Sequence, residues 1–491
     1  MHRIFLLLSV VAGLVPAGQV AAHSFGQTYT LPVPIWLYLY GAGAALLVSF
    51  IVAGYFIKAP ATSTYLREID LTGSRFGGWL VKSRLLICLR ALSVCLFMAT
   101  LLAGFLGNNE PYRNINMTLF WIVFCLGYTY LTALLGDWFG VLSPFRVIVE
   151  QLERFAPKLF SGLRPYPQVL AYWPALILYI GFIWLELFGR STPYVLSTTL
   201  LCYLLINLAG CVLVGKRAWF QYCEFFAVFL RMVGKIAPIR CVAGNKGAVT
   251  GLVLRAPGAG LIQQRRVPIS LLVFILFMLS STAFDGLHET ALWIGAFWEN
   301  LYQGLLFPLY GENPPVTFPL IKKLFLVYQT TALILSPLFY LAVFAFFMVL
   351  AKVLVRSRLS LNTLLTWFGC SLIPIVVAYH FTHYYTLLQV QGAKLVQLVS
   401  DPLGLGWNLF GTAASPMNVI PDMGVVWHTQ VFVIVVGHMV SVYLSHVQAL
   451  RVFGSRREAV LSQLPILILM LAFTTIGLWI LSLPHAAAVP G

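Results

Sequence analysis

Residues 324–351 read LFLVYQTTALILSPLFYLAVFAFFMVLA and contain no Lys, Arg, Asp or Glu. A helix of about 20 apolar residues crosses the hydrocarbon core of a bilayer, so this stretch is long enough to span a membrane. The whole chain shares this character, because 60% of its 491 residues are hydrophobic and only 9% are charged. Soluble domains carry about 25% charged residues, which excludes a soluble globular enzyme, a disordered chain and a disulfide scaffold.

Nine further segments reach spanning length, so we predict an all-α polytopic membrane protein with about ten transmembrane helices. Besides 324–351, the predicted spans are residues 34–57, 84–106, 117–136, 170–189, 195–215, 268–287, 362–391, 425–449 and 463–483. We expect residues 23–491 to form a single multi-span domain that has the lipid bilayer as its partner.

Residues 1–22 have the pattern of a secretory signal peptide. Residues 1–3 are basic, residues 4–15 are apolar but too short to span a membrane, and Val20 and Ala22 precede a plausible cleavage site. Cleavage there makes His23 the mature amino terminus. The alternative is an uncleaved signal anchor, which keeps the His23 α-amine in a peptide bond.

The distribution of basic residues predicts the orientation in the membrane. The chain holds 31 Lys and Arg against 15 Asp and Glu, a net charge of +16. With the mature amino terminus outside, 25 of the 31 basic residues lie on the inner side, five lie outside and one belongs to the signal peptide. Cytoplasmic loops of membrane proteins carry such an excess, so the charge requires no nucleic-acid partner.

Segments between the spans also carry recognisable patterns. The inner segments 138–155 and 216–240 interleave aromatic and basic residues, which favours helices that lie on the membrane surface. Asp137 is expected to cap the first of them. The outer segments 288–323 and 392–424 are rich in Trp, Gly, Pro and apolar residues, and we expect them to cover the outer face.

Ionisable residues inside spans are costly and usually line a site or a path. His380 and His383 are three positions apart and share a helical face, as do Asp285 and His288. His428 lies at the outer end of the next predicted span. Imidazole suits zinc, copper, iron or nickel, so we predict an outer-side metal site, for copper or zinc, with His380, His383 and His428 as ligands and the Asp285 carboxylate as a further candidate.

Other interpretations of these residues stay open. His23, as a mature terminus, can chelate copper through its α-amine and ring nitrogen, either as a second site or within the first. Each histidine can instead form a hydrogen bond that holds two helices together. This is the simpler interpretation for His438 or His446 alone. Glu186 is expected to pair with Arg190 at i+4. The sequence has no nucleophile elbow, P-loop, dinucleotide fingerprint or H-E-x-x-H motif.

Four stretches carry a resemblance to a known family: AHSFGQTYTLPVPIWLYLYGAGAALLVSF (22–50), AYHFTHYYTLLQVQG (378–392), SDPLGLGWNLFGT (400–412) and VVGHMVSVYLSHVQALRVFG (435–454). They are similar to a bacterial membrane family known as fenitrothion hydrolases, and the resemblance covers nearly the whole chain. Ser24 departs from the Gly expected at its position. The resemblance implies hydrolysis of organophosphorus triesters in the bacterial inner membrane, with a related membrane subunit as a partner. The distribution of basic residues places the mature amino terminus on the periplasmic or extracellular side.

Chemistry and resemblance combine into one hypothesis. A metal-bound water attacks the phosphorus of an apolar ester, His380, His383 and His428 are the metal ligands, and Asp285 is a ligand or the general base. His23 and His288 are further candidate ligands. We expect tryptophans of the outer face to accommodate the aryl group: Trp293, Trp298, Trp407 and Trp427.

Two other classes of protein compete with this hypothesis. The first is a metal-ion or proton-coupled transporter, because His428, His438 and His446 are spread over the depth of one span. Successive histidines are about 80° apart around the helix, which weakens a straight relay. The second is a copper-binding oxidase subunit, which His23 would suit.

Overall fold

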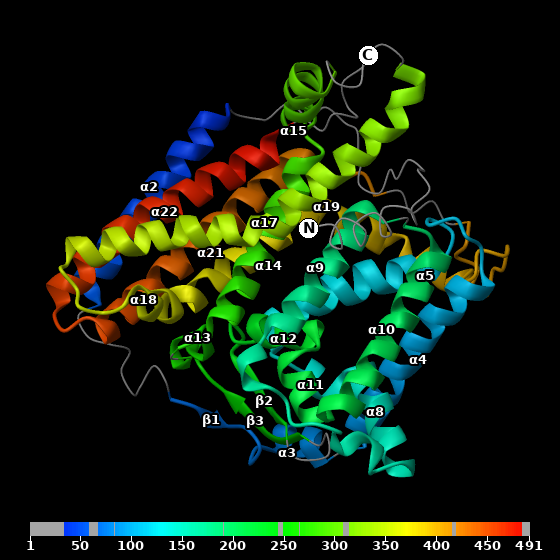
Figure 1. The fold of residues 1–491 in the computed structure, drawn as a ribbon. Coiled ribbons are helices and arrows are strands. Elements are labelled where there is room, and N and C mark those ends of the chain that lie inside the picture. Colours follow the sequence, from blue (N-terminus) through cyan, green and yellow to red (C-terminus); the bar gives the residue numbers. More distant parts are fainter. Residues whose placement is uncertain are drawn as a thin grey trace.

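Helices make up most of the chain in the computed structural model (Figure 1). It describes residues 34–57, 67–82, 84–189, 191–243, 249–264, 266–307, 314–414 and 419–483. The predicted signal peptide and His23 lie outside the described residues. Within those residues, nine helices are long and apolar enough to cross a membrane, which confirms the prediction of an all-α polytopic membrane protein.

Each predicted span corresponds to a helix of the structure. The nine long helices are α2 (Ile35–Phe56), α4 (Leu85–Leu106), Ile115–Leu135 with its parts α5 (Ile115–Met117), η1 (Thr118–Tyr128) and α6 (Thr129–Leu135), α10 (Pro193–Val214), α14 (Ile269–His288), α17 (Pro314–Leu354), Leu361–Ser400 with its parts α18 (Leu361–Phe368), η6 (Gly369–Leu372), α19 (Ile373–Ala393) and α20 (Leu395–Ser400), α21 (Met423–Val452) and α22 (Arg456–Ser482). The tenth is α9 (Trp173–Phe188), whose 16 residues reach about 24 Å at 1.5 Å per residue.

The helix α14 lies at the centre of the molecule. In the most apolar stretch of α14, 94% of the residues are buried. The corresponding value for α2 is 11%, so most of the surface of α2 is not covered by other parts of the protein. The helix α14 contacts α9, α17, α19 and α22, and its apolar residues cover all sides, as expected of a helix surrounded by other helices. Asp285 and His288, near its end, are both buried, so they lie inside the protein.

The span Ile115–Leu135 is unusual because its middle part, η1, is a π-helix. Such helices have i→i+5 hydrogen bonds, are rare, and occur often at functional sites. Here η1 packs against α19. The wider turn changes the direction in which its side chains project, and Trp121, Phe124 and Cys125 all face the cavity described below.

A small sheet and several short helices lie between the spans. The strands β1 (Ile69–Asp70), β3 (Val249–Leu254) and β2 (Ile239–Ala243) are antiparallel in that order and come from two segments of the predicted inner side. They lie beside α3 at the lower edge of Figure 1. The short helices are α3 (Arg75–Lys82), α7 (Phe139–Leu142), α8 (Pro144–Phe155), η2 (Leu159–Ser161), η3 (Gln168–Leu170), α11 (Lys216–Tyr222), α12 (Phe225–Val233), α13 (Ala259–Gln263), α15 (Ala291–Gly295) and η5 (Ala296–Leu306).

The prediction of a surface helix over 216–240 is wrong for its second half. The chain breaks at Cys223, and Glu224 caps α12 by accepting from the backbone N–H groups of Phe226 and Ala227 at 3.1 and 2.6 Å. All residues of α12 except Arg231 are buried. Its sequence FFAVFLRMV is apolar on almost every side, so the helix packs inside the protein instead of at a water–lipid boundary.

The other inner segment follows the prediction more closely. The backbone N–H of Gly140 donates to Asp137 at 3.3 Å at the start of α7, although the N-cap position of this helix is held by Trp138 and not by Asp137. In α8, Glu150 pairs with Arg90 of α4 and, at 3.1 Å, with Arg146. Burial alone would raise the pKa of Glu150, but the bonds from Arg90 and Arg146 outweigh it and lower the pKa.

Candidate functional site

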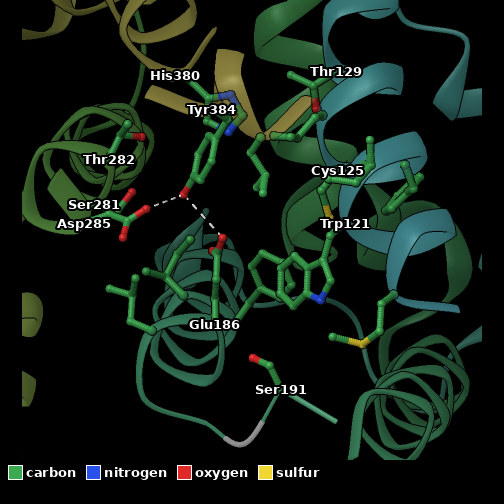
Figure 2. A pocket seen from close by; sticks show the side chains of 18 of the residues that line it. Trp121, Cys125, Thr129, Glu186, Ser191, Ser281, Thr282, Asp285, His380 and Tyr384 are labelled. Carbon is green, nitrogen blue, oxygen red and sulfur yellow. Dashed lines mark hydrogen bonds between the residues drawn. The ribbon is translucent and has the colours of Figure 1, made fainter. Parts of the chain in front are cut away.

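A cavity of about 430 Å³ lies between α9, η1, α12, α14 and α19 (Figure 2). It reaches from Tyr112 and Thr192, in the connections on the predicted outer side, to Phe229 of α12. Seven aromatic side chains contribute to its wall: Trp121, Phe124, Tyr179, Phe182, Phe225, Phe226 and Phe229. Its volume is within the range of about 300–1,000 Å³ typical of small-molecule sites.

Three polar side chains from three helices meet at the wall of this cavity. Tyr384 of α19 donates its hydroxyl hydrogen to Oδ2 of Asp285 on α14 at 2.7 Å, and the same hydroxyl lies 3.3 Å from Oε1 of Glu186 on α9 (Figure 2). Behind them, Nε2 of His383 donates to the same Oδ2 at 2.8 Å. Asp285 is thus held by two donors from α19.

The two distances from the Tyr384 hydroxyl indicate which of the two carboxyl groups, Glu186 or Asp285, carries a proton. A tyrosine hydroxyl has one hydrogen to donate, and Asp285 at 2.7 Å is closer to it than Glu186 at 3.3 Å. The Tyr384–Glu186 contact is therefore a hydrogen bond only when Glu186 holds a proton and donates it. A single negative charge, on Asp285, is also far less costly inside a membrane than two adjacent ones.

The predicted pair His380 and His383 does not converge on one point. His383 binds Asp285 of α14, whereas Nδ1 of His380 lies 3.2 Å from the hydroxyl of Tyr130 in α6. Residues three positions apart are about 60° apart around a helix. That angle is enough for each ring of α19 to contact a different neighbouring helix.

The other predicted ligands have separate partners as well. His428 lies at the outer end of α21, where Nε2 is 3.2 Å from the Tyr38 hydroxyl and Nδ1 is 2.7 Å from the Gly424 carbonyl oxygen. His288 donates from Nδ1 to the Asp285 carbonyl oxygen at 2.8 Å, and its ring stacks on Phe284. His288 does approach the Asp285 carboxylate, with Nδ1 3.9 Å from Oδ1.

A metal centre made of these residues does not fit the described geometry. In the described part of the chain, no group of three or more His, Cys, Asp or Glu side chains is arranged to hold a metal ion. His380, His383 and His428 each have a different protein partner. The copper or zinc centre stays a prediction, and one of its candidate ligands, His23, lies outside the described residues.

The sequence pattern predicts an ion pair for Glu186 and does not reveal that this side chain belongs to the site. Arg190 lies outside the described residues, and Glu186 faces the cavity and Tyr384. One signal was present in the sequence: Glu186 is the only ionisable residue with a charge at neutral pH among Trp173–Phe188. A carboxyl group inside an apolar helix needs a protein partner or a functional reason.

The cavity wall carries acidic side chains. Among the described lining residues there are two carboxyl groups and no Lys or Arg. The ammonium group of Lys394 lies 4.8 Å from the ring of Tyr112, which itself lines the cavity. None of the four tryptophans expected to bind an aryl group belongs to the described lining; Trp293 packs against Tyr328, and the tryptophan that lines the cavity is Trp121 of η1.

Comparisons with protein-family models, with curated proteins and with solved structures found no match to this chain. Function is therefore inferred from the geometry of the cavity, with the resemblance noted in the sequence as a guide to the substrate.

Proposed function

We propose that the protein is a membrane-embedded hydrolase of apolar esters, with organophosphorus triesters as the substrate class. The observation that carries the proposal is the position of Asp285, a carboxylate held by His383 and Tyr384 at the wall of an aromatic cavity. A general base must be fixed in place and able to reach the reacting water. The substrate class comes from the family resemblance.

In this proposal a water molecule in the cavity attacks the phosphorus atom and the bond to the aryl oxygen breaks. Asp285 accepts the proton of the water as the new P–O bond forms, and the aryl group leaves as a phenolate. His383 and Tyr384 hold the Asp285 carboxylate in one orientation, and such positioning contributes to the rate by fixing the reactive geometry. The aromatic wall formed by Trp121, Phe182 and Phe229 receives the apolar part of the ester.

The charge of the wall supports a neutral substrate and an anionic product. A triester is uncharged and enters an apolar cavity at little electrostatic cost, whereas the diester formed by hydrolysis is an anion. With Asp285 negative and no Lys or Arg in the described lining, the product is repelled from the place where it forms. The change from a neutral ester to an anion thus favours release of the product from the cavity.

The setting of the site follows from the sequence. We infer a multi-pass protein of the bacterial inner membrane with its mature amino terminus on the periplasmic or extracellular side, because 25 of 31 basic residues fall on the opposite side. The end of the cavity at Tyr112 and Thr192 then faces outward. A related membrane subunit is a further proposed partner, on the resemblance alone.

A second candidate function is proton-coupled transport. The observation that favours it is the row of Glu186, Tyr384 and Asp285 inside the membrane-embedded part of the fold, because carboxyl groups within spans often carry protons in transporters. A transporter changes the pH of a vesicle lumen without forming a product, whereas a hydrolase forms product in detergent, where no gradient exists.

The deciding experiment follows product formation by the full chain in lipid nanodiscs. The probe is fenitrothion, whose nitrophenolate product absorbs visible light. We expect turnover that falls by about 10²–10⁴-fold in Asp285→Asn, the usual contribution of a general base. Asp70→Asn, at an exposed carboxylate of β1, should leave the rate unchanged. Equal rates in wild type and Asp285→Asn would overturn the proposal.

The same preparations test the metal prediction. Elemental analysis of the wild type and of His380→Ala/His383→Ala shows whether copper or zinc is bound and whether these residues hold it. A near-stoichiometric metal that disappears in the double variant, together with activity that depends on it, would replace Asp285-based catalysis by the metal-dependent mechanism.

A further inference from the structure

The cavity has the chemical features of a site for an organic cation. Its described lining brings Glu186 and Asp285 close to one hydroxyl group and includes no Lys or Arg. A positive charge placed beside these carboxyl groups meets attraction from both of them. In an apolar surrounding such attraction is much stronger than in water.

The aromatic wall adds a second attraction. Trp121 and Phe182 stack with ring centroids 5.6 Å apart, and Phe182 also lies against Phe226, at 5.4 Å. The face of an aromatic ring is negative, so a cation within about 6 Å of its centre is attracted to it. A quaternary ammonium group between rings and a carboxylate is a recurrent recognition pattern.

Binding of a cation must change the protonation of the site. In the absence of a cation the Tyr384 hydroxyl lies between both carboxyl groups, and because Tyr384 gives its own hydrogen to Asp285, the 3.3 Å contact with Glu186 is a favourable hydrogen bond when Glu186 carries a proton. A cation compensates a second negative charge and so removes the reason for Glu186 to keep the proton. The other titratable groups in the described lining, or in contact with the acid pair, are Tyr112, Cys125, Tyr179, His380, His383, His288 and Tyr384.

We propose that this cavity binds an apolar organic cation in exchange for the proton of Glu186. The neutral acid of Glu186 becomes a carboxylate paired with the cation, and one proton leaves for the solvent, so the total charge of the site is unchanged. The inference shares the cavity with the proposed function but does not depend on hydrolysis. An exchange of this kind is the elementary step of a proton–cation antiporter.

The test uses three probes of closely similar shape and different charge. Benzyltrimethylammonium is a permanent cation, neopentylbenzene is its uncharged isostere, and benzylsulfonate is an anion. Isothermal titration calorimetry of the full chain in nanodiscs, with empty nanodiscs subtracted, should show that the cation binds more than about tenfold tighter than the neutral isostere. The anion should not bind.

Proton release gives an independent readout. Titrations in two buffers with different ionisation enthalpies yield the number of protons released. We expect about one proton per bound cation at a pH where Glu186 is protonated in the free protein and ionised in the complex. In Glu186→Gln the side-chain amide can still donate to the Tyr384 oxygen, so the fold of the site is kept. This variant should release no proton and bind the cation at least tenfold more weakly, whereas Glu299→Gln, outside the described lining, should behave as the wild type.

Two results would overturn the inference: equal affinity for the cation and its uncharged isostere, or unchanged proton release in Glu186→Gln. Because calorimetry requires no turnover, a protein that fails to hydrolyse triesters can still bind the cation. Conversely, hydrolysis of a neutral triester requires no cation site. The failure of one proposal is therefore distinguishable from the failure of the other.

Discussion

Nε2 of His383 lies 2.8 Å from Oδ2 of Asp285, and this bond joins α19 to the central helix α14. The side chains of both residues are largely buried, so water competes little for the bond. Because Tyr384 donates to the same oxygen, the orientation of the Asp285 carboxylate is fixed by two adjacent residues of one helix. The proposed general base is thus positioned by α19 and not by its own helix alone.

Removing the His383 donor should weaken catalysis without abolishing it. We expect His383→Leu to lower kcat for triester hydrolysis by about 10–100-fold, since a hydrogen bond to a charged group contributes about 1.5–3 kcal/mol. The loss should be smaller than in Asp285→Asn because Tyr384 still holds the carboxylate. His383→Gln, which keeps an N–H donor, should restore part of the rate. A His383→Leu enzyme with wild-type kcat would show that the bond has no role in positioning.

Tyr384 and its neighbour Tyr385 provide a matched pair. Tyr384→Phe removes both the donor to Asp285 and the link to Glu186, and we expect a decrease in kcat of at least about tenfold. Tyr385→Phe makes the same chemical change in a residue whose ring centroid lies 5.2 Å from that of Phe381 and which is not part of the described lining. In steady-state kinetics, kcat should fall in Tyr384→Phe and stay at the wild-type value in Tyr385→Phe. Similar kcat values in the two variants would contradict the assigned role of Tyr384.

The close approach of α19 and α21 depends on Gly437. A methyl group added there would lie 2.4 Å from Cβ of Ala378 and 3.0 Å from the Pro374 carbonyl oxygen, both parts of α19 that cannot move independently of the helix. We expect Gly437→Ala to destabilise the protein by about 1–3 kcal/mol, the usual cost of overpacking, and to lower the Tm measured by a thermal-shift assay in detergent. Gly181→Ala in α9 is the control, because its added methyl group meets no atom within 4 Å.

Glu224 should make stability depend on pH. Burial, the largest effect, raises the pKa of Glu224 from 4.5 to about 7, although bonds from Tyr203 and from the backbone of α12 oppose it. The unfolded chain therefore loses this proton at a lower pH than the folded protein. The contribution to stability is complete below about pH 4.5 and is lost as pH rises to about 7, a change on the order of 3 kcal/mol.

The measurement for Glu224 is Tm between pH 4.5 and 8. The wild type should lose stability over this range, and Glu224→Gln should show a flatter profile, since its amide does not ionise while its oxygen can still cap α12. Glu110→Gln, in an exposed connection, serves as the control. A profile of Glu224→Gln that parallels the wild type would refute the assignment to Glu224.

How far the sequence predicts this protein depends on whether a feature is local. The predicted spans follow from runs of apolar residues, because crossing the hydrocarbon core requires length and hydrophobicity within one segment. The same reasoning found Asp285 and His383 as residues that are costly inside a membrane. It failed for α12, where aromatic and basic residues suggested a surface helix and the structure has a buried one.

The sequence by itself determined the class of protein and the positions of its apolar helices, since both depend on free energies of transfer from water to lipid that add along a segment. Only the tertiary structure decided which polar residues meet. Tyr384 contacts Glu186 across 198 positions of the chain, whereas His380, three positions from His383, faces a different helix. The physical reason is that convergence depends on how each helix is rotated and where helices cross, and these result from packing between distant segments.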